Sequence, residues 1–228
     1  ERAYAVEQKK NLSDLVNRGS PHPSFLWPEA IVEDRRRSTF GYLMRVRDSR
    51  FYSFEHLVNG HVAPSWSVLA KVGRNLCLSF HNLHMTGLCY KDINLGGPFF
   101  DSNTGEILVC DNDNVRPDKT PGTIFMPHFA APELYRGEVS CSISTDHHSL
   151  AVMLFYLFVR HHPLEGRRLL MKNMFGDKAQ RKVYAEEPLF VFDPDDDSNS
   201  LDPLSHASPL KAWGLYPKFF QDAFVETF

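Results

Sequence analysis

The sequence lacks a long hydrophobic run. No apolar stretch approaches the roughly 20 residues that a membrane helix needs, and the longest, residues 150–159, has the length of a buried core helix. A recognisable signal peptide is absent too, although the chain begins at Glu1 within a helical pattern, so we expect natural sequence upstream. These absences predict a cytoplasmic protein with no membrane partner.

Cysteine is scarce, and no Cys-x-x-Cys pair occurs, which argues against a zinc site. We expect free buried thiols in a reducing compartment. The four cysteines are Cys77, Cys89, Cys110 and Cys141.

A charge excess of either sign is missing as well. The formal net charge is -3, which gives no reason to expect nucleic acid or an anionic membrane as a partner. The sequence also contains no internal repeat and no low-complexity segment. Hydrophobic residues make up 43% of the 228 residues, enough for the core of one large or two-lobed domain.

The first part of the chain predicts a helix followed by two strands. Residues 1–17 carry apolar side chains at helical spacing, and Gly and Pro in residues 19–23 end that pattern. Residues 25–32 and 39–46 favour strands, joined by a charged turn over residues 33–37.

The remainder is mostly helical. A helix is predicted to open at Pro64-Ser65, a short hairpin to span residues 98–110, a buried helix to cover residues 146–159, and a last helix to open at Pro217. The apolar stripe of the first helix consists of Leu69, Val72, Leu76, Phe80 and Leu83. Together the elements predict an α+β fold with a small sheet-bearing part and a larger helical part.

Three short motifs occur in one order along this pattern. Asp92 follows the long helix in Tyr90-Lys91-Asp92, Asp111 ends a hairpin strand 19 residues later, and the sequence Ala-Pro-Glu closes a loop at Glu133. This order resembles the catalytic loop, the magnesium motif and the end of the activation segment of protein kinases. Asp and Gly clusters also mark ordinary turns, so the order and spacing of the motifs carry the resemblance.

The resemblance implies a protein kinase-like two-lobed fold. Residues 1–46 would be a partial N-lobe with helix C, two strands and the start of the hinge, and residues 47–228 would be the helical C-lobe. It also implies ATP and Mg²⁺ as cofactors and a protein substrate. Asp92 would orient the attacking hydroxyl, and Asp111 would hold the metal that bridges the phosphates.

The resemblance assigns supporting roles to three further acidic residues. Asp146 would accept backbone N–H bonds from the catalytic loop, which makes a buried carboxylate tolerable. Glu133 corresponds to a glutamate that normally pairs with a buried arginine late in the fold, which we expect past residue 228. Glu7 is the candidate for the helix-C glutamate that pairs with a strand lysine, and its alternative is a solvated helix charge.

The hinge and the activation segment have candidates as well. The backbone of Met44, Arg45 and Val46 would meet the adenine base, although Met44 also suits plain core packing. Thr123 resembles the substrate-loop threonine that precedes Ala-Pro-Glu.

Several positions depart from the kinase pattern. Tyr90 and Lys91 stand where histidine and arginine are usual, and Gly97 stands where a second metal-binding asparagine is expected. Asn94 replaces a lysine, and is either a substitute ligand or a turn residue. Asp113, in Asp111-Asn112-Asp113, adds a further oxygen donor for a metal.

Some of these departures resemble one branch of bacterial kinase-like proteins. Members of that branch occur with a metal-dependent protein phosphatase and a von Willebrand factor A protein, in tellurite-resistance-type operons. Their magnesium motif has the sequence Asp-x-Asp or Asp-x-Asn, and residues 111–113 here have the first of these forms.

Three functions remain open from the sequence. The first is an ATP- and Mg²⁺-dependent serine/threonine protein kinase, favoured by Asp92, Asp111 and the Ala-Pro-Glu motif. The second is a pseudokinase that binds or scaffolds, favoured by Gly97 and by the lack of a Gly-rich loop and a strand lysine within this sequence. The third is phosphoryl transfer to a small molecule, which the Asp-x-Asp pattern favours and the Ala-Pro-Glu motif disfavours.

Overall fold

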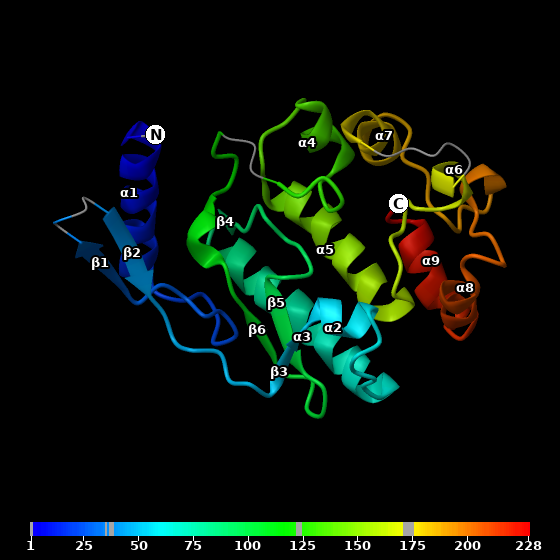
Figure 1. Ribbon diagram of the computed structural model, residues 1–228, viewed down its shortest axis with the longest axis horizontal. Helices are drawn as coiled ribbons and strands as arrows, with labels where there is room; N and C mark the ends of the chain where they lie inside the picture. Colours follow the sequence, from blue (N-terminus) through cyan, green and yellow to red (C-terminus); the bar gives the residue numbers. More distant parts are fainter. Residues whose placement is uncertain (1, 35, 37–38, 122–124, 171–175) are drawn as a thin grey trace.

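The chain folds into a small unit and a larger helical one (Figure 1). Helix α1 (Arg2–Arg18) and the antiparallel strands β1 (Ala30–Asp34) and β2 (Thr39–Leu43) form the small unit. This α+β arrangement, with a partial sheet-bearing lobe beside a helical lobe, confirms the predicted fold class. The structure is a computed structural model, and it describes residues 2–34, 36, 39–121, 125–170 and 176–228.

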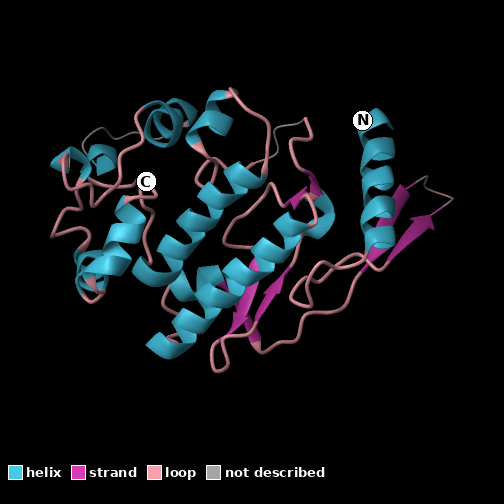
Figure 2. Cartoon of the chain, turned by 180° about the vertical axis from the view of Figure 1, so that it is seen from behind, coloured by secondary structure: helices cyan, strands magenta, loops and turns pink. Residues whose placement is uncertain are grey.

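The larger unit is built around two long helices, α3 and α5, which lie side by side (Figure 2). Its helices are α2 (Phe54–Val58), α3 (Trp66–Met85), α4 (Pro132–Arg136), α5 (Ile143–Val159), α6 (Arg167–Leu170), α7 (Asp177–Arg181), α8 (Ala207–Gly214) and α9 (Lys218–Val225). Its strands are β3 (Phe51–Ser53), β4 (Leu88–Cys89), β5 (Pro98–Asp101), β6 (Ile107–Val109) and β7 (Arg116–Pro117). Short irregular helices are η1 (Asn112–Asn114), η2 (Lys182–Glu186) and η3 (Asp197–Asn199).

Helix α3 forms where the sequence predicts it. The Ser65 hydroxyl accepts a hydrogen bond from the Val68 amide and caps the helix, and Gly87 follows its end with a φ of 73°. All five residues of the predicted apolar stripe are buried. Burying side chains of this size stabilises the fold by roughly 1.5–3 kcal/mol each.

Helix α5 begins three residues earlier than predicted. Ser142 caps it, and the Ser142 and Thr145 side chains bond each other's backbone N–H groups in a capping box, so the first turn forms before Asp146. The helix is apolar on most sides. Its Phe155 is fully buried among aromatic side chains of the C-terminal segments, which attaches α8 and α9 to the helical unit.

The hairpin β5–β6 is confirmed, and β3 adds to it as a third antiparallel strand. The predicted strand over residues 25–32 is wrong in extent, because β1 begins only at Ala30. Pro28 has no N–H to donate to a ladder. The segment before it instead lies along β6, where the Leu26 amide donates to the Val109 carbonyl at 2.9 Å.

Strand β2 is also shorter than predicted and ends at Leu43.

Of the cysteines, three are buried as predicted, whereas Cys77 is exposed on α3. Within the described residues, no helix combines the length and the apolar character that crossing a membrane requires.

Candidate active site

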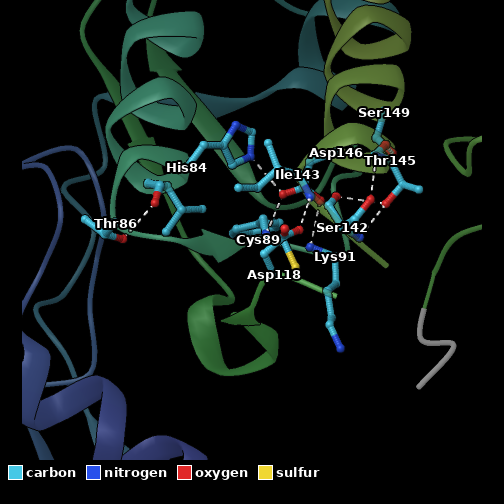
Figure 3. Close-up of polar contacts among 12 residues, drawn as sticks. His84, Thr86, Cys89, Lys91, Asp118, Ser142, Ile143, Thr145, Asp146 and Ser149 are labelled. Atoms are coloured by element: carbon cyan, nitrogen blue, oxygen red, sulfur yellow. Dashed lines mark hydrogen bonds and ion pairs between the residues drawn. The ribbon is translucent and has the colours of Figure 1, made fainter. Parts of the chain in front are cut away.

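The loop of residues 90–97 joins β4 to β5 and contains Asp92. It is held by hydrogen bonds to Asp146 of α5. The Asp146 carboxylate is 2% exposed and accepts the Tyr90 amide at 2.6 Å and the Lys91 amide at 2.9 Å (Figure 3). His84 Nε2 of α3 lies 3.0 Å from the same carboxylate. Three donors therefore compensate for the lost hydration of a buried negative charge, and the geometry agrees with the structural role predicted for Asp146.

The start of α5 also holds the chain that follows β7. The Asp118 carboxylate accepts the Ile143 amide at 2.9 Å (Figure 3). The Ser149 hydroxyl donates to the Phe129 carbonyl at 2.7 Å. Lys91, with a φ of 73°, donates from Nζ to the Thr120 carbonyl at 3.3 Å. The role of Asp118 was not predicted, since a lone aspartate after Pro gives no local pattern.

Asp111 lies at the turn that follows β6. Its φ of 54° places it in the left-handed region, which aspartate tolerates better than most residues. The next residue fixes this turn, because Asn112 is 1% exposed and donates from Nδ2 to the Leu26 and Val109 carbonyls at 2.9 and 3.0 Å. Asn112 therefore connects residues 111–114, named the metal turn after the role predicted for Asp111, to the segment that precedes β1. The sequence did not reveal this role of Asn112.

The carboxylates of Asp92, Asp111 and Asp113 lie close enough to influence one another. Partial loss of hydration at its carboxyl group raises the pKa of Asp111, although the residue as a whole is exposed, and the negative charges of Asp113 and Asp92 raise it further. Burial also raises the pKa of Asp92, an effect that the Asn94 side chain partly offsets and the charge of Asp113 reinforces. Such a concentration of like charge is favourable for a cation.

The donor set fits magnesium bound together with a nucleotide. Carboxylate oxygens are the hard ligands that Mg²⁺ prefers, and one or two of them suffice when water and phosphate complete the shell. Among the described residues, no group of three or more His, Cys, Asp or Glu side chains is arranged to hold a metal by itself. The predicted metal ligands Asp111 and Asp113 are exposed and half-buried, respectively, and so accessible to a ligand.

The Asn94 side chain is occupied within its own loop. Its Nδ2 donates to the Asp92 carbonyl at 2.9 Å, and its Oδ1 accepts the Gly96 amide at 2.9 Å. This is the geometry of a turn residue, the alternative to a ligand role at this position. The catalytic role of Asn94 stays a prediction that would require these bonds to break.

Two of the departures from the kinase pattern fit each other. Tyr90 is fully buried, and its hydroxyl donates to the Cys110 carbonyl beside Asp111. A Cβ atom on Gly97 would lie 3.0 Å from that hydroxyl, tighter than ordinary van der Waals contact. The Gly97 carbonyl in turn accepts the Cys110 amide at 2.9 Å. Glycine at this position therefore makes room for the tyrosine that links the two loops.

Helix α1 contacts Asp113 through Gln8, a residue that the sequence did not single out, and the lysine pairing of Glu7 stays a prediction. Glu7 lies on the exposed face of the helix, whereas Gln8 is half-buried and contacts Asp113 and Arg116. The two positions differ by about 100° around a helix. The sequence pattern favoured Glu7 for its charge, but Gln8 is on the face that reaches the metal turn.

The predicted hinge residues follow β2 in an extended loop. Met44 is 39% exposed and Val46 is 95% exposed, and Arg45 Nε lies 3.6 Å from Glu29 Oε1. Their contact with adenine stays a prediction, and Thr123 lies outside the described residues. Burial, and then the charges of Asp113 and Asp111, raise the pKa of Tyr42 on β2 to about 12.

Glu133 occupies the first turn of α4 and is half-buried. It lies near His148 of α5, whose pKa burial lowers to about 4 against the opposing influence of the Glu133 charge. Its pairing with a basic residue stays a prediction.

Sequence comparison finds a protein kinase among the proteins similar to this chain. No protein-family model matches the chain. The chain is 24% identical over 219 residues to protein kinase YegI of Escherichia coli O157:H7, an alignment that covers 88% of this chain and 33% of that protein. It thus spans about a third of the length of this curated relative.

The fold also matches a solved structure. A chain in the crystal structure of the yeast RNA polymerase II CTD kinase complex CTDK-1 superimposes with a TM-score of 0.60 and 16% sequence identity, over 77% of this chain and 55% of that chain. The chain therefore has a protein kinase-like fold, and ATP and Mg²⁺ are the cofactors that kinase-like relatives use in general.

Proposed function

We propose that this chain forms the catalytic part of an ATP- and Mg²⁺-dependent protein kinase that phosphorylates serine or threonine. The observation that carries the proposal is that the loop with Asp92 and the turn with Asp111 are bonded to each other, because the Tyr90 hydroxyl donates to the Cys110 carbonyl and the Cys110 amide donates to the Gly97 carbonyl. Each loop has its own hydrogen-bonded support, Asp146 for one and Asn112 for the other. Phosphoryl transfer depends on positioning and charge neutralisation, and fixed carboxylates provide both.

The roles of the chain's own residues follow from their chemistry. Asp92 would accept a hydrogen bond from the substrate hydroxyl and receive its proton as the new oxygen–phosphorus bond forms and the bond to ADP breaks. Asp111, with Asp113 beside it, would hold the cation in place. The bound metal would neutralise charge on the phosphates. Met44 to Val46 would bind adenine through backbone groups.

Two measurements on the polypeptide that carries this chain test the proposal. In a thermal shift experiment, MgATP at about 100 times its dissociation constant adds roughly 2.7 kcal/mol to the free energy of unfolding. We expect Asp111→Ala to abolish this shift. We expect Asp92→Asn to keep it while phosphate transfer to a protein substrate falls by at least about a hundredfold.

Asp195→Asn is a matched control, because this exposed aspartate lies in the acidic loop before η3, away from the site. A wild-type protein that shows no MgATP shift, or an Asp92→Asn variant that transfers phosphate at full rate, would contradict the proposal.

A second candidate is a pseudokinase that binds nucleotide without efficient transfer. Gly97 favours it, because residue 97 supplies no side-chain oxygen to the site. The outcome that favours it is an Asp111-dependent MgATP shift together with no transfer above the Asp92→Asn level.

Two further expectations also stay proposals. Co-purification tests the association with a metal-dependent phosphatase and a von Willebrand factor A protein. Cell fractionation tests the cytoplasmic location.

A further inference from the structure

Three side-chain donors, two from α1 and one from β7, converge on one backbone carbonyl beside the candidate metal site. The Asp113 carbonyl accepts Gln8 Nε2 at 3.2 Å, Asn11 Nδ2 at 3.1 Å and Arg116 Nη1 at 2.7 Å. A carbonyl oxygen has two lone pairs and usually accepts one or two bonds. The position of Asp113 is therefore set by α1 on one side and by β7 on the other.

Gln8 contributes more than one bond to this arrangement. Its Oε1 accepts a hydrogen bond from Arg116 Nη2, and its Nε2 lies 3.3 Å from the Asp113 carboxylate. An amide suits this place, because it accepts from the guanidinium and donates to the carboxylate at once. A glutamate has no donor, and its charge would add to that of Asp113 and Asp111.

Helix α1 lies at the periphery of the molecule (Figure 1). Its C-terminal end is held by the Trp27 indole, which donates to the Leu15 carbonyl at 2.9 Å. Nearer its N-terminus, Gln8 and Asn11 connect it to the 3-10 turn η1 that contains Asp113. A change in the docking of α1 is therefore transmitted to Asp113 through these amides.

We propose that Gln8 and Arg116 are positioning residues that place the Asp113 carboxylate at the magnesium site, so that docking of α1 sets the affinity for Mg²⁺. This inference rests on the proposed function, and it adds a residue pair and a helix that control the metal site. Neither residue needs to touch the metal, because both act through Asp113.

The first test measures how the MgATP thermal shift depends on Mg²⁺ at a fixed ATP concentration. We expect Gln8→Ala to raise the Mg²⁺ concentration at half-maximal shift by about tenfold, as expected for lost bonds to a charged site. Arg116→Ala is expected to act similarly, and the double variant to lose little more, because the two act as one unit. ATP binding without Mg²⁺ is expected to stay unchanged.

Lys10→Ala is the matched control, since Lys10 is on the same helix, close to Gln8, and exposed. A merely structural role for Gln8 would lower the melting temperature and leave the Mg²⁺ dependence unaltered, which would overturn the proposal. The proposal would also be overturned if Lys10→Ala and Gln8→Ala changed the Mg²⁺ dependence equally.

Hydrogen exchange provides a second test that needs no metal. We expect Gln8→Ala to speed amide exchange over residues 111–116 at least severalfold, and Lys10→Ala to leave it unchanged. Unchanged exchange in Gln8→Ala would overturn the coupling even in a protein that binds MgATP. Failure of the proposed function is distinguishable, because the wild-type protein would then show no MgATP shift whatever the exchange result.

Discussion

The two loops that form the candidate site are supported in different ways. The loop with Asp92 is anchored to the interior, where the Asp146 carboxylate is 2% exposed and holds two of its backbone amides. The turn with Asp111 and Asp113 is anchored on one side by buried Asn112 and on the other by the half-buried Gln8 of α1. Core burial fixes the first loop, and the second depends in part on a helix at the edge of the molecule.

This difference predicts which substitutions change the stability of the whole domain and which act only locally. Removing the Asp146 carboxylate leaves backbone N–H groups of the first loop, among them the buried Tyr90 amide, without an acceptor, and therefore lowers the stability of the whole domain. Damage to the α1 contacts leaves groups that water can reach, and therefore affects the metal turn locally. The two loops meet where Tyr90 and Gly97 both bond Cys110.

Asp146→Ala is expected to have the largest effect. It leaves the buried Tyr90 amide and the half-buried Lys91 amide without acceptors and is predicted to lower the free energy of unfolding by about 3 kcal/mol or more. Urea denaturation measures it, with the exposed Asp195→Ala as control. A loss below about 1 kcal/mol, similar to that for a surface substitution, would remove the distinction between the two anchors.

Gly97→Ala is expected to have an intermediate effect. The added methyl group meets the Tyr90 hydroxyl, and we predict a loss of about 1–3 kcal/mol of unfolding free energy. Removing that hydroxyl in the Tyr90→Phe, Gly97→Ala double variant is predicted to recover part of the loss, with a coupling of about 1 kcal/mol in a double-mutant cycle.

The control for this cycle is Gly214→Ala, because a Cβ atom there meets nothing within 4 Å. Strict additivity of Tyr90→Phe and Gly97→Ala would show that the two departures from the kinase pattern are independent.

The smallest effect concerns pH. Because the pKa values of Asp92 and Asp111 are raised, the folded protein binds these protons more tightly than the unfolded chain, whose aspartates titrate near about pH 3.9. The stabilisation that these two protonated aspartates contribute is fully present below the pKa of the unfolded chain. It is lost as the pH rises through the raised pKa values of the folded protein. Asp111→Asn is therefore predicted to flatten this decline and slightly stabilise the metal-free protein above about pH 4.

Urea midpoints across roughly pH 3.5 to 6, without magnesium, measure this effect. A steeper decline in Asp111→Asn than in the wild-type protein would contradict the predicted sign.

Much of the fold could be predicted because its long elements carry strong periodic patterns. The stripe of α3, the apolar character of α5 and the hairpin β5–β6 are all where the sequence indicates. The boundaries were less predictable. Strand β1 begins late because residues 24–26 lie along β6 and bond Val109, a contact between segments about 80 residues apart that no local pattern reveals.

For the site, the sequence located the acidic residues but not the groups that position them. Gln8, which the sequence did not single out, lies on the face of α1 that contacts Asp113. Gly97 suggested only a missing ligand, and the structure shows that it accommodates the Tyr90 hydroxyl. Both facts depend on which side chains meet across the fold.

The sequence by itself determined the order of the elements, the three motifs and hence the kinase-like fold, because hydrophobic periodicity and motif spacing are local properties. Only the tertiary structure decided which helix residue contacts the metal turn, why residue 97 is glycine and how each loop is anchored. Those outcomes depend on contacts such as Gln8 with Asp113, 105 residues apart in the chain, whose geometry exists only once the core has packed.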